Sequence, residues 1–176
     1  PGDKSISHRI LILASQSVGK SEISNLLEGE DVLNTLKAMR IFGANISKKN
    51  NKYIVFGVPP GGLFQPNKPI NFGNSGTGIR LICGLIASNN IKAKLVGDES
   101  LSKRPMKRVT VHLKKIGAII NLKKDSYPPI KIQGDGEALP LKYNIMIPSA
   151  QIKSAIMLSA LNTKGLIEIK EFKTTR

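Results

Sequence analysis

Three short stretches of the chain place cationic, hydroxyl and amide side chains at the start of an apolar run. The first holds Lys4, Ser5 and Arg9, the second runs over 74–80 in NSGTGIR, and the third over 149–153 in SAQIK. The first turn of a helix carries unpaired N–H groups and a partial positive charge, so it attracts anions. Cations and hydroxyls placed there add charge-assisted hydrogen bonds. The three stretches therefore predict helix starts that bind anions.

Helix capping is the competing interpretation of the same residues. Serine, asparagine and threonine lead helices for local reasons, because their side chains accept a hydrogen bond from the first turn. Capping alone explains any one of the three stretches. Three of them, each with a cation within six residues, favour a shared anion site.

A fourth stretch, GDESLSKRPMKR over 97–108, brings an arginine to the start of a further predicted helix. A strand ends at Gly97, an exposed loop follows, and Pro105 suits a first helical turn. The planar guanidinium of Arg104 can grip a carboxylate or phosphate there. The alternative is a surface ion pair between Arg104 and Asp98 or Glu99.

The histidines and the single cysteine do not form a catalytic or metal site. His8 lies between a serine and an arginine in an early helical turn, where a packed, hydrogen-bonded ring is the expectation. His112 lies in VTVHLKK and is interpreted as structural. Cys83 lies in the apolar stretch RLICGL and is expected to be a small buried hydrophobe. A lone cysteine excludes an intrachain disulfide and favours a reducing compartment.

The chain contains an internal repeat of about 73 residues. Arg9 matches Arg80 at an offset of 71, and Gly43 matches Gly117 at an offset of 74. A third copy begins near PSAQIK. We therefore expect one domain over 1–176 with units at about 1–70, 71–145 and 146–176, the first two joined by the loop PPGGLFQPNKP.

Helical and extended patterns alternate within each unit. The predicted helices cover 5–15, 31–42, 75–88, 105–116 and 150–160. The predicted strands cover 21–26, 45–49, 52–57, 92–97, 119–124 and 129–134. This order predicts an α/β or α+β domain of repeated βαβαββ units around shared buried helices.

The chain is strongly basic, with 27 lysines and arginines against 12 acids and a net charge of +15. Nucleic acid, a small anionic substrate and a lysine-rich soluble surface are the three interpretations. The lysines are scattered and aromatic residues make up 5% without tryptophan, so nucleic acid is disfavoured. There is no apolar run of about 18 residues and no secretory signal, so we expect a cytoplasmic protein without a membrane partner.

Four stretches together, PGDKSISHR, NSGTGIR, GDESLSKRP and PSAQIKSA, resemble the 5-enolpyruvylshikimate-3-phosphate (EPSP) synthase family in order and spacing. The resemblance covers essentially all 176 residues. It implies transfer of the enolpyruvyl group of phosphoenolpyruvate to the 5-hydroxyl of shikimate 3-phosphate, with release of phosphate, in aromatic amino acid biosynthesis. It implies no metal or organic cofactor. The implied fold is the inside-out α/β barrel of the enolpyruvyl transferases.

The resemblance assigns the phosphoenolpyruvate site to five residues. Lys4 would contact both substrates, Asn74 and Gly76 would lie against phosphoenolpyruvate, and Arg104 would hold its anionic end. Gln151 would lie close to it as well. Catalytic contributions fall to Lys4, Arg104 and Gln151. A glycine at the position of Gly76 is also what leaves room for the inhibitor glyphosate in this family.

The resemblance assigns the shikimate 3-phosphate site to residues from the first and third units and from the end of the chain. They are Lys4, Ser5, Arg9, Ser149, Ala150, Gln151 and Arg176. Some relatives have serine where this chain has Ala150, so only the backbone can donate there. The match at Arg176 is weaker because the motif breaks off after it.

Chains of this family are more than twice as long and fold as two similar domains that close like a clamp. We therefore expect residues 1–176 to be most of the N-terminal domain, with the C-terminal domain as its partner and the full-length protein a monomer. Carboxylates and a lysine of that second domain would complete the proton transfers. This chain alone is expected to give no detectable phosphate release.

Two alternatives remain open from the sequence. The sister enzyme that transfers enolpyruvyl to UDP-N-acetylglucosamine shares the fold but uses a reactive cysteine in a mobile loop, unlike Cys83 in its apolar stretch. The other alternative is a noncatalytic module that binds anions or nucleic acid. Salt-steep DNA binding without binding of the phosphorylated sugar would favour that module.

Overall fold

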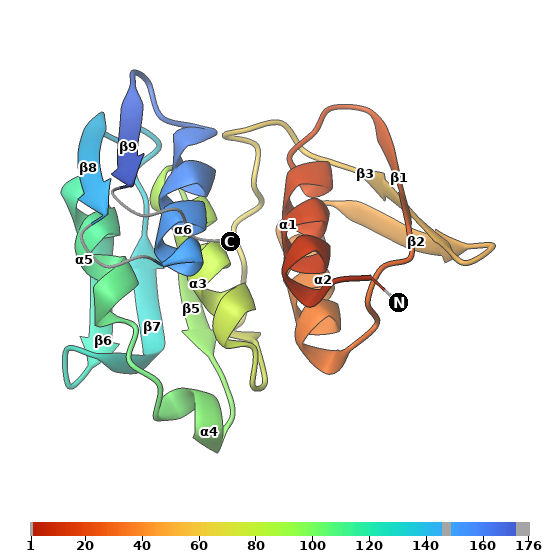
Figure 1. The fold of residues 1–176 in the computed structure, drawn as a ribbon, viewed down its shortest axis with the longest axis horizontal. Coiled ribbons are helices and arrows are strands. Elements are labelled where there is room, and N and C mark those ends of the chain that lie inside the picture. The colour runs from red at the N-terminus through yellow and green to blue at the C-terminus, as the bar shows by residue number, and fades with distance from the viewer. Residues whose placement is uncertain (1, 146–148, 172–176) are drawn as a thin grey trace.

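The helices of the chain lie between three small β-sheets, which form the outside of the molecule (Figure 1). This arrangement is seen in a computed structural model that describes residues 2–145 and 149–171. Apolar faces of both kinds of element meet in the interior, so one connected cluster of buried side chains joins the helices to the first two sheets, and partly buried side chains of the third sheet pack against it. Within the described residues, no helix has the length and apolar character needed to cross a membrane.

The first unit is a three-stranded antiparallel sheet with two helices on its inner face. Its elements are α1 (Lys4–Ser15), β1 (Lys20–Ser24), α2 (Glu30–Ile41), β2 (Asn45–Lys49) and β3 (Lys52–Phe56). The strand order is β1-β3-β2. Inward side chains such as Ile23, Ile46 and Val55 are buried, so alternation along the strands fixes which face meets the helices.

The second unit has a four-stranded sheet in the order β4-β5-β7-β6. Its elements are β4 (Ile70–Asn71), α3 (Gly76–Ala87), β5 (Lys92–Val96), α4 (Glu99–Ser102), α5 (Lys107–Lys115), β6 (Ile119–Lys123) and β7 (Tyr127–Gln133). Strands β4 and β5 are parallel and connected by α3, while the other pairs are antiparallel. A third unit consists of β8 (Leu141–Ile145), α6 (Ala150–Ala160) and β9 (Ile167–Glu171), with β8 and β9 parallel.

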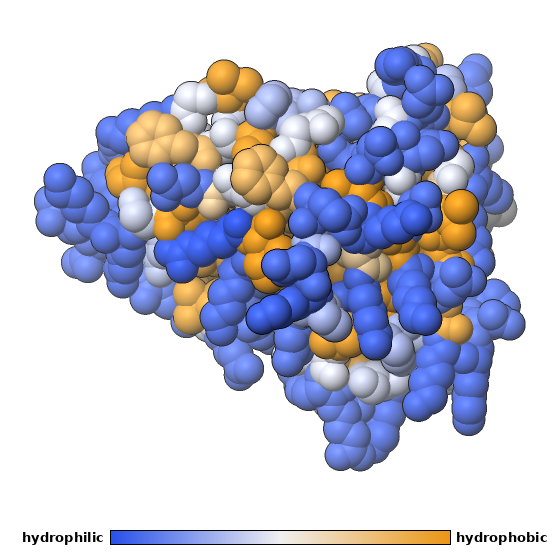
Figure 2. Space-filling model, turned by 180° about the vertical axis from the view of Figure 1, so that it is seen from behind, coloured by the Kyte–Doolittle hydropathy of each residue, from blue (hydrophilic) through white to orange (hydrophobic). Residues whose placement is uncertain are grey.

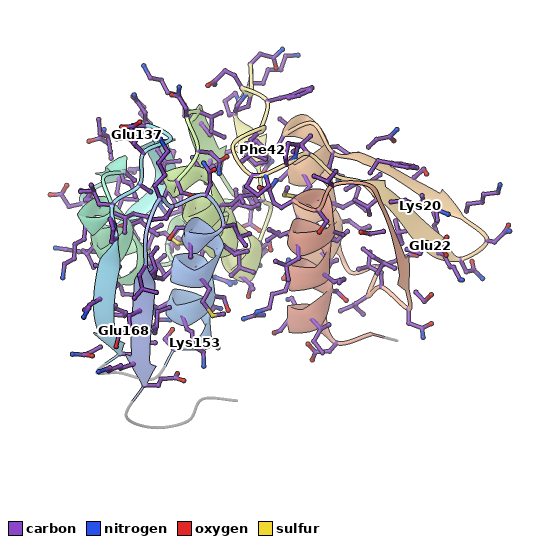
Figure 3. The ribbon with its side chains drawn as sticks, turned by 90° about the horizontal axis from the view of Figure 1, so that it is seen from above. Lys20, Glu22, Phe42, Glu137, Lys153 and Glu168 are labelled. Carbon is purple, nitrogen blue, oxygen red and sulfur yellow. The ribbon has the colours of Figure 1, made fainter. Side chains whose placement is uncertain are left out.

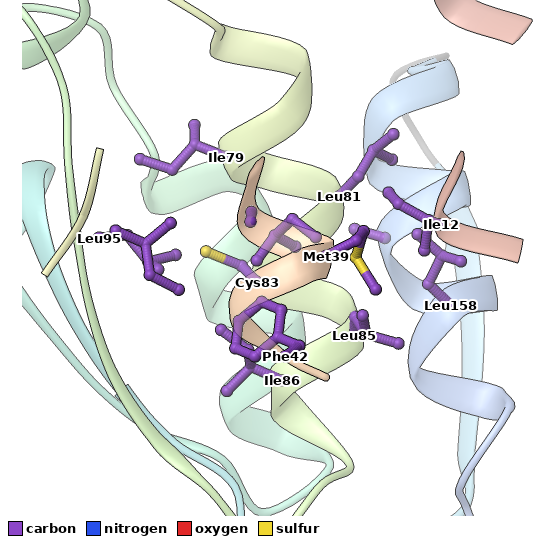
Figure 4. Close-up of a cluster of buried hydrophobic side chains, with 14 of the residues drawn as sticks. Ile12, Met39, Phe42, Ile79, Leu81, Cys83, Leu85, Ile86, Leu95 and Leu158 are labelled. Atoms are coloured by element: carbon purple, nitrogen blue, oxygen red, sulfur yellow. The ribbon is translucent and has the colours of Figure 1, made fainter. Parts of the chain in front are cut away.

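Helix α3 lies at the centre of the molecule, and almost every one of its residues is buried. Figure 4 shows side chains of α1, α2, α6 and β5 around it, among them Ile12, Met39, Leu158 and Leu95. Burying one large aliphatic side chain contributes about 1.5–3 kcal/mol. The core therefore couples all three units, and the helix starts that it carries are held on packed rather than mobile elements.

The predicted helices are all present, with differences at their ends. Gly43 and Gly117 follow α2 and α5 with φ of +104° and +107°, which confirms the predicted helix stops. Helix α5 begins at Lys107 rather than at Pro105, and the N–H of Met106, the residue before it, donates to the Ser126 carbonyl at 2.7 Å.

The loop predicted after Gly97 is wrong in one respect, since it contains the short helix α4. Asp98 caps this helix by accepting a 2.7 Å hydrogen bond from the Leu101 N–H, and the Leu101 side chain is fully buried. Strands β4, β8 and β9 were also not predicted. Strand β4 has two residues and no pattern of its own, and it is extended beside its parallel partner β5. Strands β8 (LKYNI) and β9 (IEIKE) do alternate apolar and polar residues, so their sequences carried a strand signal that was missed.

Candidate anion-binding site at three helix starts

Helices α1, α3 and α6 run in the same direction, so their N-terminal ends lie on the same side of the molecule (Figure 1). Each start is capped by a side-chain oxygen that accepts a backbone N–H: Asp3 from Ile6, Ser75 from Gly78 and Ser149 from Ile152, at 2.8, 3.1 and 3.4 Å. Capping is thus present at all three starts. Each cap occupies one N–H of the first turn. Capping does not involve the cationic side chains, which make contacts of their own.

Arg9 connects the start of the first unit to the third unit. Its Nε and Nη2 both donate to the Ser154 Oγ on α6, at 3.1 and 2.8 Å, and its Nη1 donates to the Ser5 carbonyl at 2.9 Å. These bonds hold the guanidinium over the gap between α1 and α6. Lys4, at the first turn of α1, forms an ion pair with Asp31 of α2 and keeps about half of its side chain exposed.

Gln151 connects the third unit to the second. Its Nε2 donates to the Thr77 Oγ1 at the start of α3 over 3.2 Å. With this amide orientation its Oε1 is buried and has no hydrogen-bond partner among the described residues. An unpaired buried oxygen is costly, so a donor from a bound molecule would be favourable here. Ser149 and Ala150 lie beside it, both partly exposed.

Arg104 and Gly76 lie together at the start of α3. Arg104 donates from Nη2 to the Asn74 Oδ1 and, at 3.4 Å, to the Ser100 Oγ. A Cβ placed on Gly76 would lie 3.0 Å from the Arg80 Nη1 and 3.1 Å from the Arg104 Nη1. The absence of a side chain at Gly76 therefore lets two guanidinium groups approach the same backbone segment.

Arg80 is the buried member of this cationic cluster, with 7% of its surface exposed. It donates to the Gly76 carbonyl at 2.9 Å and to the Pro105 carbonyl at 3.0 Å. Its pKa is lowered, mainly by burial and further by the neighbouring charges of Arg108 and Arg104. No carboxylate of the described residues forms an ion pair with these three arginines. A cluster of like charges without a counter-ion is suited to binding an anion.

Comparison with known proteins identifies the chain. The family model of EPSP synthase (3-phosphoshikimate 1-carboxyvinyltransferase) matches residues 1–175. The chain belongs to the EPSP synthase family. This confirms the family predicted from the four sequence stretches.

Curated relatives and solved structures agree with the family. The chain is 46% identical to the 3-phosphoshikimate 1-carboxyvinyltransferase of Parvibaculum lavamentivorans and 45% identical to that of Streptococcus pyogenes, covering 100% of this chain and 39% and 42% of those proteins. An EPSP synthase structure from Acinetobacter baumannii superposes with a TM-score of 0.94 at 38% identity, covering 100% of this chain and 40% of that one. The predicted fold class is therefore confirmed, and the chain spans about 40% of the length of the relatives it matches.

His8 belongs to the packed scaffold beneath the candidate site. Its ring is fully buried, and its Nδ1 lies 2.8 Å from the Thr35 Oγ1 of α2. Burial lowers its pKa to about 4, against an opposing effect of Asp31 and with added repulsion from Lys4 and Arg9. A ring that is neutral at pH 7 and enclosed between two helices agrees with the packed residue predicted from the sequence.

Cys83 and His112 are structural residues, as predicted. Burial raises the pKa of the Cys83 thiol to about 12, so it is protonated and enclosed among core side chains (Figure 4). His112 Nε2 lies 2.9 Å from the Tyr143 hydroxyl, and the two rings are in contact. Across residues 2–145 and 149–171, no group of three or more histidines, cysteines and acids is placed to hold a metal ion.

The structure brings together the predicted residues of all three helix starts and adds some that sequence reasoning missed. Asp31 and Ser154 were not predicted, and only packing of the helices places them against Lys4 and Arg9.

The cation of Lys153, predicted as part of the third helix start over 149–153, is held by Glu171 of β9 at 2.7 Å. Arg176 lies outside the described residues. The alternative pairing of Arg104 with an acid is not seen, since Asp98 caps α4 and Glu99 pairs with Lys103.

Proposed function

We propose that the protein containing this chain transfers the enolpyruvyl group of phosphoenolpyruvate to the 5-hydroxyl of shikimate 3-phosphate and releases phosphate. The observation that supports this most directly is the arrangement of the three helix starts. Arg9 is held on α6, Gln151 is held on α3, and Arg104 lies at the glycine start of α3. One anionic substrate can then bind at Arg9 and the other at Arg104.

Shikimate 3-phosphate is assigned to the side formed by α1 and α6. Arg9 and Ser5 would bind its anionic groups, and Ser149, the Ala150 backbone and Gln151 would bind from the opposite side. The buried, unpaired Oε1 of Gln151 is an acceptor that suits a ring hydroxyl of the sugar. Arg176 is retained in this proposal on the resemblance alone.

Phosphoenolpyruvate is assigned to the start of α3. Arg104 now donates to two neutral oxygens, those of Asn74 and Ser100. Exchanging them for a carboxylate or phosphate would replace neutral acceptors by charged ones, which form stronger hydrogen bonds. Gly76 would allow the anion to approach the backbone, and Arg80 behind it would add positive potential without moving.

The reaction needs a C–O bond between the 5-oxygen and C2 of phosphoenolpyruvate, with the hydroxyl proton passed to a base and a proton added from an acid to the methylene carbon. Loss of phosphate from that tetrahedral intermediate and of a proton from the new methyl group restores the double bond. Among the proposed residues of this chain, Lys4 is the group able to carry a proton, and Asp31 orients it. We propose that the remaining acid–base groups come from a second domain, as the family's length implies. No metal or cofactor is part of the proposal, and a cytoplasmic monomer is proposed for the whole protein.

The test is substrate binding and phosphate release by the full-length protein. Replacing Arg104 by alanine should weaken binding of phosphoenolpyruvate, measured with shikimate 3-phosphate present, by about 30-fold or more, since a charge-assisted pair contributes about 2 kcal/mol or more. Lys103→Ala changes an adjacent exposed cation that pairs with Glu99 and should leave this binding unchanged.

Two results would contradict the proposal. One is wild-type protein that releases no phosphate from the two substrates together. The other is turnover with UDP-N-acetylglucosamine in place of shikimate 3-phosphate, which would favour the sister enzyme despite the buried Cys83.

A further inference from the structure

The outer face of the β4-β5-β7-β6 sheet carries a groove away from the helix starts. The groove has a volume of about 440 Å³ and lies between the 66–69 segment and the outward side chains of β5, β6 and β7. Helices α3 and α5 cover the opposite face of this sheet (Figure 1). Figure 2 views the molecule from behind and shows hydrophilic side chains crossing hydrophobic surface there. We call this surface the lysine groove; its cations are Lys68, Lys92, Lys94 and Lys131.

Two of these lysines face each other directly. Lys94 on β5 is the cross-strand partner of Lys131 on β7 in the antiparallel register, and Lys92 precedes Lys94 on the same face. Like charges placed opposite each other across a sheet destabilise it. Within the described part of the chain, no carboxylate forms an ion pair with any lysine of the groove.

In each of the other two sheets, a glutamate lies close to two lysines. Glu22 on β1 accepts from Lys20 at 2.6 Å and lies 3.5 Å from Lys52, and Figure 3 shows Lys20 and Glu22 together on their strand. The third sheet likewise places Glu168 between two lysines, at 3.5 and 3.3 Å. Both glutamates have a lowered pKa because of these lysines.

The middle residue of β1 is Glu22, and the middle residue of the matching strand β5 is Lys94. The second unit therefore has a cation where the first unit has the carboxylate that neutralises its lysines. In the sheets that carry a glutamate, its carboxylate forms ion pairs with the neighbouring lysines. The lysine groove lacks that internal carboxylate, and one supplied from another molecule can take its place.

We propose that the lysine groove binds an acidic, extended segment of a partner protein. Lys92 and Lys94 are two residues apart on one face, a spacing of about 6.6 Å, which matches alternate side chains of an extended peptide. Beside the cations, the groove exposes Ile119 on the edge strand β6, 59% accessible, and the amide of Gln133. A segment that alternates carboxylates with small apolar residues therefore matches both the charge and the surface.

A single-stranded nucleic acid fits this groove less well. Such ligands are held by aromatic side chains on which bases stack, and no aromatic residue lines the groove. A short segment held mainly by exposed charges is expected to bind transiently and to bind more weakly as salt is added.

The experiment measures binding of a fluorescent peptide of alternating glutamate and alanine to the full-length protein at low salt. The test variant is Lys94→Glu with Lys131→Glu. The control, Lys49→Glu with Lys114→Glu, makes the same charge change at exposed sites elsewhere. The test variant should bind at least about tenfold more weakly and the control within about twofold, since two attractive surface pairs become repulsive.

A second measurement separates binding from folding. Lys94→Glu alone puts a carboxylate between Lys92 and Lys131, as Glu22 lies between its lysines, so its melting temperature should be unchanged or higher while peptide binding falls. Phosphate release should be unchanged, since the groove lies away from the proposed substrate residues. Wild-type protein that does not bind the peptide saturably, equal binding by the test variant, or displacement of the peptide by a thymidine oligonucleotide of equal charge would each overturn the proposal.

Discussion

The guanidinium of Arg9 donates two hydrogen bonds to one hydroxyl, that of Ser154, across 145 residues of sequence. The contact joins α1 of the first unit to α6 of the third. Because the same hydroxyl receives both Nε and Nη2, it fixes the plane of the guanidinium as well as its position. The side chain proposed to bind shikimate 3-phosphate is thus oriented before any ligand arrives.

Replacing Ser154 by alanine tests this orientation. The variant removes the acceptor and leaves Arg9 with the Ser5 carbonyl as its described partner, so the guanidinium gains rotational freedom. We expect the dissociation constant for shikimate 3-phosphate to rise about fivefold, which corresponds to a net hydrogen bond of about 1 kcal/mol. Isothermal titration calorimetry on the full-length protein measures it.

The matched control for that measurement is Ser24→Ala on β1, an exposed serine outside the proposed site. Ser154→Ala should also leave the melting temperature close to that of the wild type, since the hydroxyl is partly exposed. An unchanged dissociation constant for Ser154→Ala would show that Arg9 does not need this contact.

Gly76→Ala tests the close approach of Arg80 and Arg104 to the start of α3. The new Cβ would lie 3.0 Å from the Arg80 Nη1 and 3.1 Å from the Arg104 Nη1, so one guanidinium must shift by a few tenths of an ångström. Arg80 is held by two carbonyls, and the displacement is therefore expected at Arg104. Binding of phosphoenolpyruvate and inhibition by glyphosate should both weaken, while binding of shikimate 3-phosphate alone stays within about twofold of the wild type. Inhibition assays and calorimetry provide the two readouts, and equal glyphosate inhibition of both proteins would contradict the expectation.

The sequence predicted the elements that carry a strong local signal. The helix over 150–160 follows from its cap, Ser149, and its apolar period, and the structure gives the same bounds. Strand β4 has two residues and no pattern of its own, and it is extended because Phe72 donates to the Val96 carbonyl beside it. Local patterns cannot show such an element, because its stability comes from a distant strand.

The candidate site divides in the same way. Its cations could be named from the sequence, because helix starts and the repeat mark Arg9, Arg80 and Arg104. The partners of those cations could not, since Ser154 and Asp31 meet them only through the packing of α1 on α6 and α2. Lys94 shows a third case: only the bounds of β5 match it with Glu22 in the middle of β1, and only the strand register reveals that it faces Lys131.

The buried ring of His8 predicts a pH dependence of stability. Its pKa is about 4 in the folded protein against 6.5 in an unfolded chain, so between these values the unfolded state binds more protons. The stability that neutral His8 contributes is fully present above pH 6.5 and is lost as the pH falls toward 4. The loss is up to about 3 kcal/mol.

His8→Gln isolates this contribution, because glutamine can still bond to the Thr35 hydroxyl but does not titrate. Urea unfolding of wild type and variant at several pH values should show a difference in the free energy of unfolding that shrinks below pH 6.5. Carboxylates titrate in both proteins and cancel in the difference. Parallel curves for the two proteins would contradict the assigned pKa.

Gly84→Ala tests whether the contact of α3 with α6 positions the site. A Cβ on Gly84 would lie 2.1 Å from the Ala155 carbonyl oxygen and 2.7 Å from its Cα, so the backbone of one helix must move. We expect a loss of about 3 kcal/mol in the free energy of unfolding, the scale of overpacking a rigid core. Because the same two helices carry Thr77 and Gln151, the 3.2 Å contact between those side chains should be lost as well.

The control is Gly29→Ala, whose new Cβ would have no neighbour nearer than 4.0 Å. It should lower the free energy of unfolding by less than about 1 kcal/mol. Unfolding experiments and titration with shikimate 3-phosphate check both effects, and a variant as stable as the control would show that α3 and α6 can separate without cost.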